Sequence, residues 1–122
     1  MELNDLIRAV KEHPEYHRVG MILCHNGVVR ATSRDGRPVT GLRVAVDPAR
    51  LEAVLETYRR RPGIVDVRVA IAADRDLAVG DDVMHLVVAG DVRENVLRTL
   101  SEALEEIKGT VTTKTEYFVD EA

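Results

Sequence analysis

The chain has 122 residues, 45% of them hydrophobic and 31% charged, and a formal net charge of -4 at pH 7. We expect one domain over residues 1–122, large enough to bury its own core. The acidic balance argues against a nucleic-acid binder that works through phosphate contacts, because such domains carry a basic excess. No apolar run approaches the roughly 20 residues that span a bilayer, and nothing at the start predicts a signal peptide. Cys24 is the only cysteine, which excludes an intramolecular disulfide and suits a reducing cytoplasm; we expect a buried structural thiol.

Turn residues divide the first part of the chain into a helix and three extended segments. We expect Asn4 to cap a short helix that Pro14 ends, and an apolar run predicts a strand over residues 18–24. Residues 25–27, His-Asn-Gly, are expected to break that strand, and 28–32 to resume it. Asp35-Gly36 indicates a hairpin, with residues 39–46 as the returning strand.

The middle of the chain predicts a helix and two strands. Asp47-Pro48 is a strong helix start. The arginines at 59–61 fall in the last turn, where cations interact favourably with the negative end of the helix dipole. We therefore expect those arginines to be structural. Strict alternation predicts a strand over 65–71, then a turn region over 73–82 around Gly80, then a strand over 83–88. His85 in that strand is expected to face solvent or to be hydrogen-bonded rather than catalytic.

The last third predicts a helix with cations at both ends. Asp91 and Glu94 have the spacing of a capping box, and the apolar positions that follow recur with helical period: Val96, Leu97, Leu100, Leu104 and Ile107. Arg93 falls in the first turn, where a cation is unfavourable to the helix dipole, so we expect it to hold an anion. Lys108 falls in the last turn before Gly109, where the dipole alone would account for it.

Residues 110–119 alternate as a strand that carries a further lysine. Lys114 shares one face with Glu116, which is also typical of a solvated strand edge. The order of elements predicts an α+β two-layer sandwich, a mostly antiparallel sheet packed by helices, with a ferredoxin-like arrangement as the alternative. Fold by itself leaves the function open.

Three short motifs in this order resemble the large, catalytic subunit of molybdopterin synthase, over residues 19–118. The first is Gly27-Val28-Val29-Arg30 after a strand. The second is the turn Leu77-Ala78-Val79-Gly80-Asp81-Asp82, which leads through a valine-rich strand to Val92-Arg93. The third is a helix ending in Ile107-Lys108, followed by a strand that carries Lys114 and Glu116.

The chain also departs from that family's pattern at four places. Val92 stands where the family has a histidine, and Ala72-Ala73 replaces a histidine-arginine pair. Ala45 replaces a glutamate in the third strand. The link from Lys108 to Lys114 is one residue shorter, and a one-residue change in a strand reverses the face that a side chain occupies.

The resemblance implies sulfur transfer in molybdenum cofactor biosynthesis. A small ubiquitin-like partner, ending in Gly-Gly, would carry a C-terminal thiocarboxylate whose sulfur passes to cyclic pyranopterin monophosphate. Lys108 and Lys114 would be the catalytic residues, and Arg30 and Arg93 would bind substrate, because arginine can hold a phosphate in a bidentate manner. The resemblance further implies a homodimer within a heterotetramer, Arg93 reaching the other subunit's site, and no metal or redox cofactor.

Two other functions stay open from the sequence. The lost histidines and the shortened link would also suit a non-catalytic paralogue that binds the partner. A ferredoxin-like regulatory domain that binds a small molecule through its glycine-containing turns is the third possibility.

Overall fold

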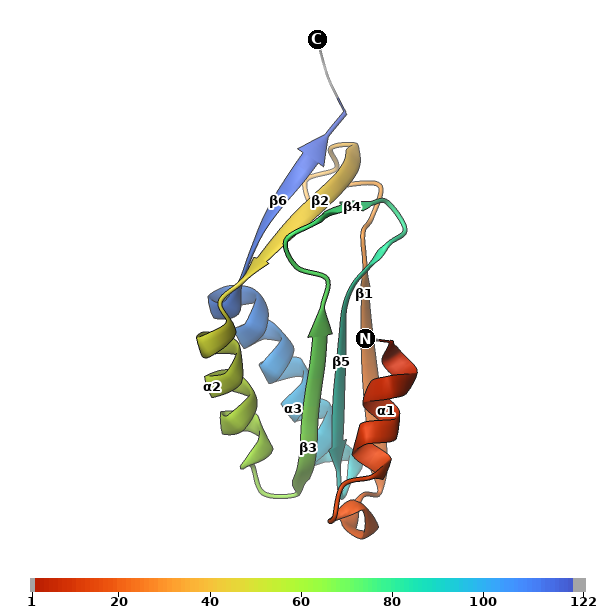
Figure 1. Cartoon of the computed structure of the whole chain (residues 1–122), viewed down its shortest axis with the longest axis vertical. Helices are drawn as coiled ribbons and strands as arrows, with labels where there is room; N and C mark the ends of the chain where they lie inside the picture. The colour runs from red at the N-terminus through yellow and green to blue at the C-terminus, as the bar shows by residue number, and fades with distance from the viewer. Residues whose placement is uncertain (1, 120–122) are drawn as a thin grey trace.

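The computed structural model describes residues 2–119 as two three-stranded antiparallel sheets with three α-helices (Figure 1). The first sheet has the order β1-β5-β3 and the second the order β4-β2-β6. The strands are β1 Met21–Val28, β2 Val39–Val46, β3 Ile64–Ile71, β4 Asp76–Ala78, β5 Asp82–Gly90 and β6 Thr112–Phe118. The α+β class with antiparallel strands is confirmed, although six strands form two sheets where we expected one.

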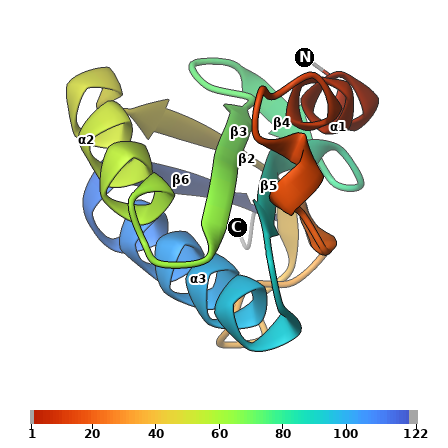
Figure 2. The same ribbon diagram turned by 90° about the horizontal axis from the view of Figure 1, so that it is seen from below.

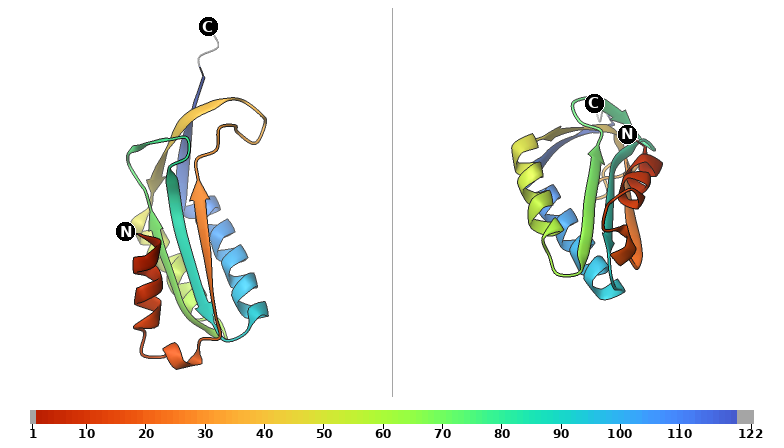
Figure 3. Two further views of the ribbon diagram at one scale, coloured as in Figure 1. Left: turned by 90° about the vertical axis from the view of Figure 1, so that its right-hand side faces the viewer. Right: turned by 60° about the horizontal axis from the view of Figure 1, so that its bottom comes forward.

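The helices cover both faces of the first sheet. They are α1 Leu3–Lys11, α2 Pro48–Arg59 and α3 Arg93–Glu106, and 3-10 and π-helical turns, η1 and η2, span Tyr16–Arg18 and Ile107–Val111. Figures 2 and 3 show α1 on one face of the sheet and α2 with α3 on the other. The larger core lies under α2 and α3, around Val67, Leu86 and Val96, and a smaller one lies under α1, around Val10 and Val87. None of the helices in residues 2–119 is long and apolar enough to cross a membrane.

The N-terminal third differs from the expectation in how its segments end. The N-cap of α1 is Glu2 instead of Asn4, and the Asp5 carboxylate accepts a hydrogen bond from the Glu2 backbone N–H at 3.0 Å. Strand β1 does not break at residues 25–27, because a register shift at Gly27/Val28 accommodates the irregular residues within the ladder. Gly36 does form the expected tight turn, with φ 86, but the strands on either side belong to different sheets.

The middle of the chain begins as predicted and then departs from strict alternation. The Asp47 carboxylate caps α2 by accepting from the Arg50 backbone N–H at 3.1 Å. A register shift between Ile64 and Asp66 interrupts the alternation of β3, so that Ile64 and Val67 are both buried. The short strand β4 lies within the region predicted as turn.

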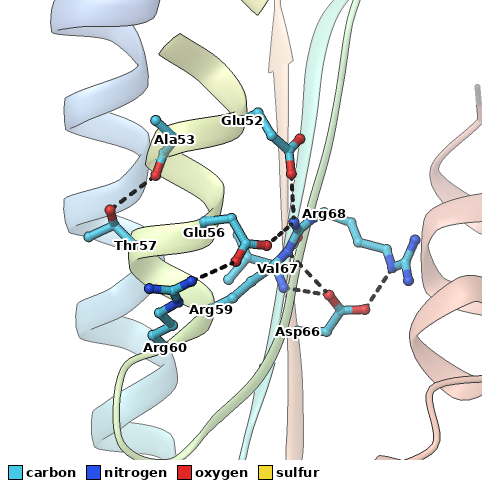
Figure 4. Close-up of polar contacts among 9 residues, drawn as sticks. All are labelled: Glu52, Ala53, Glu56, Thr57, Arg59, Arg60, Asp66, Val67 and Arg68. Carbon is cyan, nitrogen blue, oxygen red and sulfur yellow. Dashed lines mark hydrogen bonds and ion pairs between the residues drawn. The ribbon is translucent and has the colours of Figure 1, made fainter. Parts of the chain in front are cut away.

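Arg59 is structural, as expected, although ion pairs and a hydrogen bond hold it rather than the helix dipole alone. Its Nε donates to the Val67 carbonyl oxygen at 2.9 Å, and its Nη1 lies 3.3 Å from Glu52 Oε1 and 3.2 Å from Glu56 Oε1 (Figure 4). The same Nε lies 3.7 Å from Oδ1 of Asp66. The end of α2 is thereby tied to β3.

Asp66 is the buried end of this network. Only 4% of the residue is exposed, its Oδ1 accepts from the Val67 backbone N–H at 2.9 Å, and its Oδ2 accepts from Arg68 Nε at 2.7 Å. A buried carboxylate needs such partners, because desolvation of an unpaired charge is costly.

Two side chains lie where we did not expect them. Cys24 is exposed rather than buried, since β1 is an edge strand that pairs only with β5 among the described strands. His85 is 8% exposed rather than solvent-facing, its Nδ1 has no hydrogen-bond partner, and its Nε2 lies 3.8 Å from Oδ2 of Asp82.

The predicted capping box of α3 is wrong. The N-cap residue is Val92, and the Asp91 carboxylate instead accepts from the Val92 backbone N–H at 2.6 Å and from Asn95 Nδ2 at 2.9 Å. Leu97, which we placed on the buried face, is 47% exposed, whereas Thr99 is buried. Arg93 is the first residue of α3, in the first turn as expected.

Candidate functional site

A cavity of about 620 Å³ lies where the two sheets meet. Its walls come from β1, β2, β3, β5 and β6, from the loop after β1, and from the π-helical turn η2. Both predicted catalytic residues, Lys108 and Lys114, line it. We therefore take this cavity as the candidate site.

Lys108 reaches the cavity from a turn that continues α3. Gly109 does not end the helix as predicted: the chain goes on as a π-helical turn, and the Thr112 backbone N–H donates to the Ile107 carbonyl. Ile107 and Val111 are 0% and 4% exposed, so both ends of this turn are anchored in the core. Lys108 lies between them and is exposed. A π turn of this kind is rare and is frequently found at functional sites.

Lys114 reaches the cavity because of the strand register. In the β2–β6 ladder Lys114 lies opposite Val44 and Glu116 lies opposite Leu42, and residues directly opposite share a face. Val44 and Leu42 are buried and also line the cavity. The shorter link has therefore not turned Lys114 away from Lys108.

The replacement of the family's glutamate by Ala45 leaves the cavity wall intact. Ala45 lies opposite Thr113, and both residues are exposed on the other face of the second sheet. Within one chain this position does not contribute to the cavity.

The charged side chains around the cavity favour an anion. Arg34, Lys108 and Lys114 line it together with the carboxylates Asp35 and Glu116, which leaves one net positive charge. Lys114 Nζ lies 3.9 Å from Glu116 Oε1. The Asp35 carboxylate accepts a hydrogen bond from the Ser33 hydroxyl, which is the main reason that its pKa is lowered. Among the ion pairs formed within residues 2–119, none involves Lys108.

His25 and Arg34 line the same cavity, and sequence reasoning missed both. His25 had been assigned to a chain break. Had β1 been continued to residue 28, its alternation would have placed His25 on the face of Leu23, which packs against the larger core. Arg34 had no such signal, because it lies in a loop.

Arg30 and Arg93 do not line the cavity. Arg30 is exposed beyond the end of β1, and Arg93 begins α3, whereas Lys108 lies in η2, which follows the other end of that helix. With a rise of about 1.5 Å per residue, the two backbone positions are roughly 22 Å apart. A single chain thus brings together the two lysines and separates them from the two arginines.

A second cavity, of about 500 Å³, shares Met84 with the first and is lined by Asp81, Asp82 and His85. It contains none of the four predicted site residues. In residues 2–119 no group of three or more His, Cys, Asp or Glu side chains is placed to hold a metal ion.

Several solved structures have the same fold. A molybdopterin synthase from Staphylococcus aureus superposes with a TM-score of 0.72 at 20% identity, over 87% of this chain and 84% of that one. The complex of subunits 1 and 2 of molybdopterin-converting factor from Helicobacter pylori gives 0.70 at 19%, over 99% and 86%. Molybdopterin cofactor biosynthesis protein E from Burkholderia multivorans gives 0.75 at 23%, over 98% and 84%.

No curated protein matches the sequence. The sequence profile of the family described as "MoaE protein" matches residues 1–110, nine tenths of the chain, and includes β1 and Lys108. The chain therefore belongs to the MoaE protein family.

Proposed function

We propose that this chain acts in molybdenum cofactor biosynthesis as the sulfur-transferring subunit of a molybdopterin synthase. Sulfur would pass from the C-terminal thiocarboxylate of a small partner subunit to cyclic pyranopterin monophosphate. The observation that carries the proposal is the pair Lys108 and Lys114, which line one cavity with a net positive charge in a member of the MoaE protein family.

The cavity suits the chemistry of these reactants. A thiocarboxylate, a phosphate and the oxyanion of an acyl intermediate are all anions, and fixed cations stabilise charge that develops during a reaction. Lys108, outside the ion pairs of the described residues, would hold or attack the carbonyl of the partner's C-terminal glycine. Lys114 would assist from the facing strand.

The partner would be a ubiquitin-like sulfur carrier that ends in Gly-Gly. Support comes from the Helicobacter pylori structure, whose chain of the same fold is in a complex of subunits 1 and 2 of molybdopterin-converting factor. The cytoplasm stays the predicted compartment for this reaction.

Arg93 would serve the site of a second subunit in a homodimer. Its separation from Lys108 within one chain supports this role, since Arg93 does not line the cavity of its own chain. Val92 and Leu97 beside it leave apolar surface open, being 49% and 47% exposed, and a dimer contact would cover them. Arg30 would bind substrate at the rim, where the chain leaves β1.

Reconstitution tests the function directly. The chain, the thiocarboxylated partner and the pterin precursor should together yield molybdopterin. Lys108→Ala should lower the rate by about 10²–10³ while partner affinity changes little, because the lost cation acts mainly in the transition state. A wild-type chain that yields no product with saturating partner and precursor would contradict the proposal.

One observation favours a second candidate, a non-catalytic paralogue that binds the same partner. The position before Arg93, a histidine in the family's pattern, is Val92, whose exposed apolar side chain can neither donate nor accept a proton. Such a paralogue would bind the small subunit in a pull-down or calorimetric assay and release no product.

A further inference from the structure

His25 has no role in the reaction as described so far, yet it shares the cavity with the two lysines. It projects from β1, an edge strand of the first sheet, whereas Lys108 comes from the π-helical turn η2 and Lys114 from the second sheet. Three separate elements thus place one imidazole and two amines around the same space.

One of the two ring nitrogens of His25, Nε2, is shielded from solvent. Its Nε2 is buried and has no hydrogen-bond partner, and it lies 3.4 Å from the position that a Cβ would take at residue 27, which is glycine. A Cβ at residue 27 would be in ordinary van der Waals contact with the ring. With Nε2 covered, Nδ1 is the nitrogen that can exchange a proton with the cavity.

The surroundings of His25 favour its neutral form. Desolvation lowers its pKa below the ordinary 6.5, and the charges of Lys108 and of His85 lower it further. The other charged groups that line the cavity are those of β6 and of the loop after β1, Lys114 with Glu116 and Arg34 with Asp35. An imidazole that stays unprotonated at neutral pH is a competent proton acceptor.

We propose that His25 is the general base that activates water to release the partner from the transferred sulfur. The proposal rests on the function proposed above. Once a thiocarboxylate sulfur has bonded to an acceptor, that sulfur still carries the partner's glycine acyl group as a thioester. Completing the transfer requires that the bond between the acyl carbon and the sulfur be broken.

The step balances without any further reactant. The water oxygen bonds to the acyl carbon as His25 takes one of its protons, and Lys108 stabilises the oxyanion. The carbon–sulfur bond then breaks, and the sulfur leaves as a thiolate on the acceptor. The partner regains a free C-terminal carboxyl group, which keeps the second proton of the water and loses it to solvent to become the carboxylate. The proton on His25 passes to the thiolate or to solvent.

The test uses a short peptide thioester ending in Gly-Gly, which needs no sulfur transfer. Its hydrolysis by the full chain is followed between about pH 5 and pH 8. Wild type should lose activity on the acid side with a midpoint below the ordinary 6.5 of histidine. His25→Gln should be slower by about 10²–10³ and should lack that acid limb. His17→Gln, whose histidine lies in η1 with 72% of its side chain exposed, is the matched control and should behave as wild type.

The result that overturns the proposal is a folded His25→Gln chain with wild-type rate and pH profile. If that variant does not fold, NMR titration of the wild type decides: a His25 pKa at or above 6.5, or one that Lys108→Met fails to raise, rejects it. Failure of the two proposals is distinguishable. Thioester hydrolysis that depends on His25, without molybdopterin formation, rejects only sulfur transfer; molybdopterin formation that His25→Gln leaves intact rejects only the base.

Discussion

Exchanging two neighbouring residues of β6 tests whether the face of Lys114, rather than its charge, matters. In the double variant Thr113→Lys with Lys114→Thr, composition and net charge are unchanged. Successive side chains of a strand point to opposite faces, so the amine moves from the cavity to the outer face, opposite Ala45.

The expected loss of stability is small. Thr113 and Lys114 are both exposed, and substitutions at such positions usually change the free energy of unfolding by less than about 0.5 kcal/mol. The pair between Lys114 Nζ and Glu116 Oε1 at 3.9 Å is also lost, and a surface ion pair contributes about 0.2–1 kcal/mol. At roughly 3–5 °C per kcal/mol, the melting temperature should fall by less than about 10 °C.

The expected loss of activity is large by comparison. Removing one preorganised charge donor from a site typically costs about 10²–10³ in rate, so molybdopterin formation should fall by that factor in a chain that is still folded. Each single change is a control: Thr113→Lys should keep wild-type turnover, and Lys114→Thr should be as slow as the double variant. Turnover within roughly threefold of wild type in the double variant would refute the assignment of Lys114 to the cavity.

Three more measurements test the network, the acid response and the dimer. Asp66→Asn should lower the free energy of unfolding in urea by about 2 kcal/mol, because a buried acceptor of a charged donor is weakened; an unchanged midpoint would contradict this. Tyr117→Phe removes the hydrogen bond that most lowers the pKa of Asp76, so by NMR that pKa should rise toward the ordinary 3.8. A carboxyl group whose pKa is lowered in the folded state stabilises the fold above pH 3.8. That stabilisation is lost as the pH falls from 3.8 through the lowered pKa, so the variant should lose the contribution of Asp76 at a higher pH than wild type. Mixing inactive Arg93→Ala and Lys108→Ala chains should restore about a quarter of wild-type turnover if Arg93 serves the other subunit, and none if it does not.

Local patterns explain which elements could be predicted. Asp47-Pro48 sets the start of α2 through a side-chain hydrogen bond within one turn, and it was predicted as observed. Alternation in residues 110–119 was also local, so the shared face of Lys114 and Glu116 followed from the sequence. The division of the strands into two sheets was not predictable, because it depends on pairings between distant segments such as β1 with β5.

The errors share a physical cause. Asp91 has the spacing of a capping box, but its carboxylate accepts a hydrogen bond from Asn95 Nδ2, and the N-cap residue is Val92. The place of His25 within β1 was not predicted, because the Asn and Gly that follow it usually end a strand. Here a register shift accommodates them within the strand. In the first case a competing contact at the start of α3 overrode the expected pattern, and in the second the pairing of β1 with β5 did so.

The register of β6 follows from the anchors at its start. The Val111 carbonyl accepts from the Asp47 backbone N–H at 3.0 Å, which joins the π-helical turn to the residue that caps α2. Val111 is 4% exposed, so a slip by one residue would take it out of the core and turn every following side chain to the other face. The burial of Val111 and the cap of α2 therefore stabilise the register in which Lys114 joins Lys108. The short link between the lysines is compatible with a shared cavity because this turn, rather than the number of residues, decides which face of β6 is turned inward.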